Sequence, residues 1–156
     1  MSTHSYVITE VTVIPRLLAG VRAQVPLGHV AQHFGTYLDQ VYAAARTGAV
    51  TLDGQNVFVY RSAVDGMLTV DFCVGATQPF APIGAVTPIE TPHGRAVTTT
   101  HWGDYSGIRD ANHAIWAWCD ANGRKRAGPS WEVYGHWNDK PSERRTDIFY
   151  LLEPDA

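Results

Sequence analysis

One carboxylate in an aromatic stretch is the feature of this sequence best suited to chemistry. Glu132 lies in the run SWEVY, whose composition predicts a β-strand, and Tyr134 follows two residues later. Side chains alternate along a strand, so Glu132 and Tyr134 share one face while Trp131 takes the other. If the closing hairpin pairs about its loop, Glu132 falls near Phe149. A carboxylate in this setting could hold an organic cation by Coulomb attraction and cation–π contacts.

Two other roles for Glu132 stay open on the residues alone. It could form an ion pair with Arg144 or Arg145 on the neighbouring strand, because buried acidic residues usually have a partner. It could instead act as a general acid or base beside Tyr134, since burial among aromatic rings favours the protonated carboxyl. The sequence holds no G-x-S-x-G nucleophile motif, so catalysis would require direct activation of water.

Further aromatic residues could line the site around this carboxylate. Trp116 and Tyr105 belong to the second predicted helix and its start, and Tyr37 flanks the apolar stripe of the first helix. Packing in the core is the competing role for each of them. The predicted ligand contacts are Glu132, Tyr134, Trp116, Tyr60, Phe58, Tyr105, Phe149 and Tyr37. In the enzymatic alternative, Glu132 and Tyr134 are the catalytic pair.

Metal binding is a weaker interpretation of the histidines. His29 and His33 have the one-turn spacing of a zinc pair, but a zinc site also needs a third ligand and supporting hydrogen bonds. No such ligand is evident in the sequence nearby, so we expect a solvated helix face, with no metal and no cofactor. Cys73 and Cys119 lie far apart in unlike elements, which predicts buried, reduced thiols.

Two amphipathic helices are predicted to position these residues. Apolar side chains recur at three- and four-residue steps from His29 to about Thr47, and again between Gly103 and Gly123. The first stripe comprises Val30, Phe34, Leu38, Val41 and Ala45, and the second comprises Ile108, Ala111, Ile115, Trp118 and Cys119. Asp104 or Ser106 could cap the second helix.

Strand-like runs rich in β-branched and aromatic residues surround both helices. They cover approximately residues 6–14, 17–25, 55–62, 66–75, 88–91, 95–101, 131–137 and 145–152. The segment 76–87 is rich in proline and glycine, so it reads as a linker inside a single domain of residues 1–156.

The two halves of the chain follow the same plan. Val57–Tyr60 can be laid over Trp131–Tyr134, and Val70–Phe72 over Asp147–Phe149, at a steady offset near 75 residues. The predicted fold is therefore α+β, a tandem repeat of two strand–strand–helix–strand–strand half-domains at about 6–75 and 88–152. Each half would form an antiparallel sheet with one main helix, and a cleft would lie between the helices.

This motif order resembles the GyrI-like small-molecule-binding domain of the SOUL/GyrI-like superfamily. That domain is also the effector-binding half of several AraC- and MerR-type regulators. The most specific matches are Gly128-Pro129, Glu132, Tyr134 and Thr146. The resemblance implies a cleft for an apolar, often cationic compound, with the floor glutamate at Glu132. Related stand-alone members include a gyrase inhibitor and hydrolases of strained-ring natural products.

Composition narrows the partners. A net charge of -3 and a pI near 6.1 give no electrostatic footprint for nucleic acid. The sequence has neither a signal-peptide pattern at its start nor an apolar run long enough for a bilayer. Its predicted strands fill the stretch from about residue 6 to 152, leaving no DNA-binding segment. We therefore expect a stand-alone cytoplasmic protein, monomer or homodimer, without nucleic-acid or membrane partners.

The predicted function is binding of an amphipathic, aromatic or cationic compound, for sensing, sequestration or tolerance of a toxic molecule. One alternative is a hydrolase of a strained electrophilic natural product that uses Glu132 and Tyr134. The other is an interaction module of the gyrase-inhibitor type, whose protein partner would be DNA gyrase or a regulator.

Overall fold

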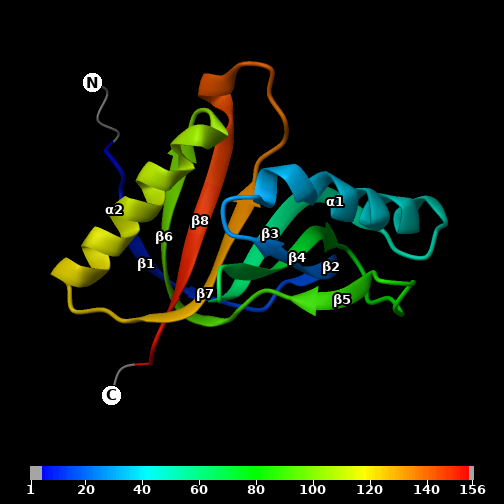
Figure 1. Cartoon of the computed structure of the whole chain (residues 1–156), viewed down its shortest axis with the longest axis horizontal. Coiled ribbons are helices and arrows are strands. Elements are labelled where there is room, and N and C mark those ends of the chain that lie inside the picture. The colour runs from blue at the N-terminus through cyan, green and yellow to red at the C-terminus, as the bar shows by residue number, and fades with distance from the viewer. Residues whose placement is uncertain (1–4, 155–156) are drawn as a thin grey trace. The chain divides into compact units, whose positions relative to one another are not determined.

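The computed structural model describes residues 5–154, which form eight strands and two α-helices. Figure 1 labels these elements along the chain. The chain divides into two compact units. Unit 1 combines Met1–Ile14 with Pro92–Ala156, and unit 2 is Pro15–Thr91. Each unit is an antiparallel sheet with one α-helix, so the α+β fold with two similar halves is confirmed.

Unit 2 carries α1 (Val30–Arg46) on a sheet of four strands in the order β3-β4-β2-β5. These strands are β2 (Leu17–Pro26), β3 (Leu52–Val64), β4 (Met67–Ala76) and β5 (Thr87–Glu90). The helix buries Leu38 and Val41 of the predicted apolar stripe together with Ala44, whereas the predicted Ala45 is only half-buried. Gly48 follows with φ of 84°, the left-handed conformation that ends a helix at little cost.

Unit 1 has the strand order β1-β6-β8-β7, with α2 (Ile108–Ala121) packed on one face. Its strands are β1 (Thr9–Val13), β6 (Gly94–Trp102), β7 (Arg126–Tyr134) and β8 (Arg145–Leu152). The helix buries Ile108, Ala111, Ile115 and Cys119 against Val97, Ile148 and Leu152 of the sheet. A 3-10 turn, η1 (Tyr105–Gly107), leads into α2, and η2 (Pro141–Glu143) lies in the loop between β7 and β8.

The first strand of each sequence half pairs in the sheet of the other half. β1 pairs with β6 of unit 1, and β5 pairs with β2 of unit 2. A proline follows each of these strands within two residues, at Pro15 and Pro92, and a residue without an N–H donor cannot continue a ladder. The two structural units therefore differ from the sequence halves by this exchange of strands.

Unit 2 also holds an ion cluster that sequence reasoning missed. The Asp71 carboxylate is fully buried in β4 and accepts both a bidentate contact from Arg22, at 2.7 and 3.0 Å, and a contact from Arg61 at 2.8 Å. A buried carboxylate is tolerated only when its oxygens are satisfied in this way. The sequence could have predicted this cluster, because an aspartate inside the apolar run TVDFCV is buried with the strand and then needs a cationic or hydrogen-bonding partner.

Among the described residues, neither helix is both long enough and apolar enough to span a bilayer.

Candidate functional site

Glu132 and Tyr134 form a hydrogen-bonded pair on the face of unit 1 that α2 covers. Only 8% of Glu132 is exposed, and the Tyr134 hydroxyl donates to its Oε1 at 2.6 Å. Both residues lie on β7, and Glu132 is paired with Ile148, which packs against α2. Directly paired residues point to the same face, so the register places this carboxylate on the face of the sheet that carries α2.

The register moves Phe149 away from the carboxylate. Glu132 pairs with Ile148, whereas Phe149 pairs with Trp131 and stacks on its ring at 5.1 Å between centroids. The expectation that Glu132 falls near Phe149 is wrong by one residue, and a shift of one residue reverses the face. The physical reason lies in the hairpin. β7 ends at Tyr134 rather than near residue 137, so the loop is longer than predicted.

The two arginines considered as partners of Glu132 have other contacts. Arg145 begins β8 one residue before Thr146, which places its side chain on the opposite face, where its Nε contacts Asp147 at 3.0 Å. Arg144 donates to the Asn138 carbonyl at 2.9 Å and lies 3.6 Å from Asp104. Both arginines are therefore engaged by oxygen atoms other than those of Glu132.

An aromatic cluster extends from Tyr134 past the end of β7. Tyr105, at the start of η1, packs edge-on against Tyr134 with the ring centroids 5.8 Å apart. The Arg144 guanidinium lies 3.9 Å from the centroid of the Trp137 ring and 5.7 Å from that of Tyr105. Trp137 is 64% exposed, so this end of unit 1 presents aromatic surface next to the buried pair.

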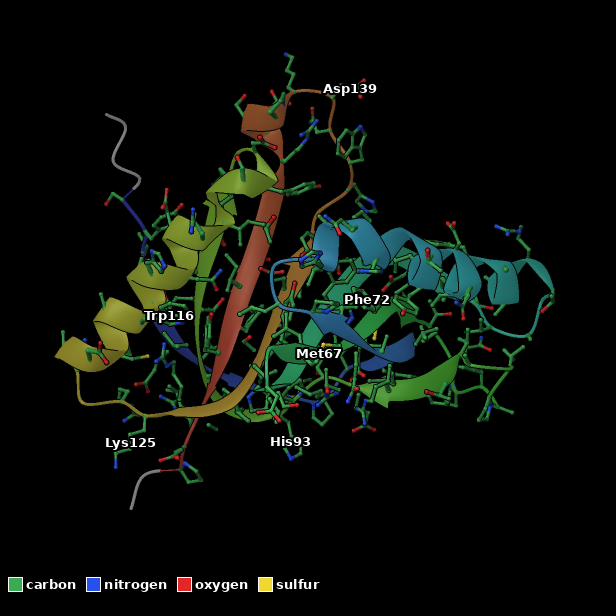
Figure 2. The ribbon with its side chains drawn as sticks, in the orientation of Figure 1. Met67, Phe72, His93, Trp116, Lys125 and Asp139 are labelled. Atoms are coloured by element: carbon green, nitrogen blue, oxygen red, sulfur yellow. The ribbon has the colours of Figure 1, made fainter. Side chains whose placement is uncertain are left out.

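Trp116 contacts Tyr150, which in turn is hydrogen-bonded to Asn112, and sequence reasoning missed both of these residues. Trp116 lies on α2 (Figure 2). Its ring packs edge-on against Tyr150 of β8, with the ring centroids 6.4 Å apart. The Tyr150 hydroxyl donates to Asn112 Oδ1 at 2.6 Å. Burial raises the pKa of Tyr150, the Trp116 indole lowers it, and the negative charge of Glu132 raises it. Tyr150 and Asn112 therefore belong to the same polar and aromatic group as the carboxylate.

His101, on β6, is a buried polar residue of the same face. Its Nε2 lies 2.9 Å from the Asp104 carbonyl and its Nδ1 lies 2.8 Å from the Tyr6 hydroxyl. A carbonyl only accepts, so Nε2 carries the proton and, in the neutral ring, Nδ1 accepts from Tyr6. Gly107 permits the close approach of η1, because a Cβ there would lie 2.7 Å from the imidazole.

Thr146 lies between these groups in the sheet. It pairs with His101 on one side and with Tyr134 on the other, and it is fully buried. Its hydroxyl oxygen has no hydrogen-bond partner among the described residues. Leaving a buried hydroxyl unsatisfied costs about 1–3 kcal/mol, so its presence is unusual.

The remaining predicted contacts lie in unit 2, on the face that α1 covers. Phe58 packs against Phe34 of α1 with the ring centroids 5.8 Å apart, and Tyr37 stacks on Phe72 at 5.1 Å. Figure 2 labels Phe72. Tyr60 follows Phe58 by two residues on β3, so it shares that face. Phe58 and Tyr37 thus belong to one aromatic cluster, which also serves as core packing for unit 2.

The histidine pair and the cysteines have ordinary surroundings. His29 Nδ1 lies 2.9 Å from Gln32 Oε1 at the start of α1. Within residues 5–154, no three histidine, cysteine or acidic side chains gather as a metal site would require. Cys73 and Cys119 are free and buried, as predicted, and desolvation raises the pKa of both thiols.

Comparison with known families matches nearly the whole chain. The profile of the GyrI-like small molecule binding domain matches residues 7–152. A search of curated protein sequences finds no significant match.

Solved structures share the fold at low sequence identity. The EcmrR C-terminal domain superposes with a TM-score of 0.72 at 21% identity, covering 97% of this chain and 98% of that domain. In an EcmrR–DNA complex the TM-score is 0.78 at 21% identity, with 96% of this chain covered, but this chain spans only 58% of the EcmrR chain.

Two further structures have different ligands or activities attached to the same fold. A hydrolase from Listeria innocua has a TM-score of 0.61 at 12% identity, covering 94% of this chain and 91% of that one. SAV2435 bound to tetraphenylphosphonium has a TM-score of 0.61 at 10% identity, covering 96% of this chain and 94% of that one.

Proposed function

Because this chain belongs to the GyrI-like small-molecule-binding family, we propose that it binds an amphipathic organic cation with Glu132 as the charge partner. The observation that carries the proposal is a carboxylate only 8% exposed that accepts a hydrogen bond from Tyr134, whose ring packs on Tyr105. Its biological role would be sensing, sequestration or tolerance of a toxic compound.

Aromatic rings around the carboxylate supply the apolar part of the proposed site. Tyr134 and Tyr105 pack edge-to-face, and Trp116 with Tyr150 approaches from α2. A cation over an aromatic face gains about 2 kcal/mol when water is excluded, so a few such contacts give micromolar affinity. Phe149 is omitted, because it lies on the other face with Trp131. Phe58, Tyr60 and Tyr37 of unit 2 remain predicted contacts.

The test compares a cation and a neutral compound of similar shape. Tetraphenylphosphonium and triphenylphosphine oxide would be titrated calorimetrically into wild type, Glu132→Gln and the matched control Glu143→Gln, whose carboxylate is exposed. Losing one buried charge contact should weaken the phosphonium by about tenfold or more, equivalent to about 1.4 kcal/mol. The neutral compound and the control variant should change little. Phosphonium binding that survives Glu132→Gln unchanged rules out the charge-partner role.

A second candidate function is hydrolysis of a strained-ring electrophile. The observation in its favour is the short Tyr134–Glu132 hydrogen bond, which keeps Glu132 available as an acceptor for a proton from water. Glu132 would take that proton, the hydroxide would attack the ring carbon, and Tyr134 would donate to the oxygen or nitrogen released. Turnover of styrene oxide by wild type and not by Glu132→Gln would support this reaction over simple binding.

A further inference from the structure

The two units place different residues at equivalent buried positions. On the helix-bearing face of each sheet, one cross-strand pair occupies the equivalent position. It is Phe58 with Phe72 on β3 and β4 of unit 2, and Glu132 with Ile148 on β7 and β8 of unit 1. The next row across the sheet is Ala23, Val70 and Tyr60 in unit 2, and His101, Thr146 and Tyr134 in unit 1. Unit 2 therefore has apolar residues at the positions that Glu132, His101 and Thr146 occupy in unit 1.

Most of these polar groups in unit 1 are satisfied by the protein itself. Thr99 donates to the Val7 carbonyl at 2.9 Å, and His101 contacts Tyr6 and the Asp104 carbonyl. Thr146 differs, because its hydroxyl has no partner among the described residues. Valine fits the equivalent position at Val70, which is equally buried. Packing therefore gives no reason for a hydroxyl at position 146.

The position of Thr146 relative to the carboxylate gives such a reason. It is the direct cross-strand neighbour of Tyr134 and the diagonal neighbour of Glu132 on the same face. Diagonal neighbours are about 7–8 Å apart with their Cβ atoms somewhat closer, and the long glutamate side chain narrows this gap further. A nitrogen with several N–H donors can bridge two oxygens at this spacing, whereas a quaternary cation has no N–H to offer.

We propose that Thr146 is the second hydrogen-bonding contact for the cation held at Glu132, so that the site selects protonated primary and secondary amines over quaternary or phosphonium cations. This inference rests on the proposed function. The hydroxyl is covered in the present conformation, beside the Tyr134 side chain that donates to Glu132. The incoming ammonium takes the place of the Tyr134 hydroxyl on the carboxylate, and Tyr134 turns aside to uncover Thr146.

The experiment uses two cations that differ only at nitrogen. Biphenyl-4-ylmethylammonium and its N,N,N-trimethyl derivative would be titrated into wild type, Thr146→Val, and the control Thr99→Val, which is buried on the same face but has a partner. Wild type should bind the primary ammonium more tightly. Thr146→Val should weaken the primary ammonium by about fivefold to tenfold and leave the trimethyl compound unchanged. Thr99→Val should keep the preference.

Thermal unfolding of the ligand-free variants separates this role from a structural one. Thr146→Val should melt at or above the wild-type temperature, because the hydroxyl it removes has no partner to lose, whereas Thr99→Val should melt lower. A Thr146→Val variant that melts lower, or that weakens both cations equally or neither, overturns the inference while Glu132-dependent binding stands. Failure of both cations to bind wild type overturns the proposed function as well.

Discussion

At the scale of single residues, the hydrogen bond from Tyr134 to Glu132 helps a largely buried carboxylate to keep its charge. A phenol that donates at 2.6 Å satisfies one carboxylate oxygen without neutralising its charge. An arginine side chain in place of the Tyr134 hydroxyl would itself be the cation bound to Glu132 and would compete with a cationic ligand. The pairs made by Arg144 with Asp104 and Arg145 with Asp147 keep those cations on other acids.

Replacing Tyr134 with phenylalanine tests this division of labour. The variant keeps the ring that packs on Tyr105 and removes only the donor to Glu132. We expect a loss of about 1.5–3 kcal/mol in the free energy of unfolding, measured in urea, because a hydrogen bond to a charged group disappears. Tetraphenylphosphonium affinity should stay within a few-fold of wild type, since ring and carboxylate remain.

Tyr42→Phe is the matched control for that measurement, because its hydroxyl donates at 2.7 Å to the neutral amide of Asn56 in unit 2. Its cost should be smaller, about 0.5–1.5 kcal/mol. Equal costs for the two variants would show that the bond to Glu132 gains nothing from charge.

Residue types alone singled out Glu132 and Tyr134 and placed them on one face, which the register of β7 confirms. Tyr150 and Asn112 could not be found in the same way. Their hydrogen bond joins β8 to α2, 38 residues apart, and only the packed structure shows which helix face meets which strand. Periodicity does place Tyr150 on the face of Ile148, two residues earlier, once the register is known.

At the scale of elements, the helices and strands were predictable and the hairpin register was not. Periods of 3.6 and 2 residues, with runs rich in β-branched residues, locate α1, α2 and the eight strands to within about five residues. The β7–β8 loop carries no such period. The loop starts at Gly135 rather than near residue 138, and the partner of Glu132 is Ile148 rather than Phe149.

The same one-residue error affects the overlay of the β4 sequence on the β8 sequence. Phe72 pairs with Phe58 and lies under α1, and the residue in its place in unit 1 is Ile148, not Phe149. The offset for these strands is therefore 76 residues rather than 77. A sequence overlay that is wrong by one residue still looks convincing, although it reverses every side chain of the strand.

The β7–β8 loop itself is ordered by Arg144, which gives a prediction at this scale. Its guanidinium lies 3.9 Å from the centroid of Trp137 and bonds the Asn138 carbonyl. Arg144→Gln removes the cation–π contacts, so the loop should open more often and chymotrypsin should cleave after Trp137 several-fold faster. Lys140→Gln, in the same loop but 77% exposed, should not change the rate. Unchanged cleavage in Arg144→Gln would show that the stack does not order the loop.

At the scale of the whole molecule, duplication separates what the fold requires from what the site requires. Both units need a helix over a four-stranded sheet, and unit 2 meets that need with Phe58, Val70 and Phe72 on the face that α1 covers. Its buried Asp71, next to Val70 on β4, points to the other face. The buried polar residues of unit 1, namely Thr99, His101, Glu132 and Thr146, are therefore additions to the scaffold. Such groups reduce stability unless they are satisfied, which marks unit 1 as the specialised copy.

Exchanging the residues at one equivalent position tests this asymmetry directly. Val70→Thr puts a hydroxyl at a site with 0% exposure, between Ala23 and Tyr60, and should cost about 1–3 kcal/mol in urea unfolding. Thr146→Val makes the reverse change in unit 1 and should cost nothing, because its hydroxyl is already unsatisfied. If Val70→Thr lowers the free energy of unfolding and Thr146→Val raises it, the fold tolerates Thr146 at a cost in stability. Destabilisation by both variants would instead make each residue the best fit for its own unit.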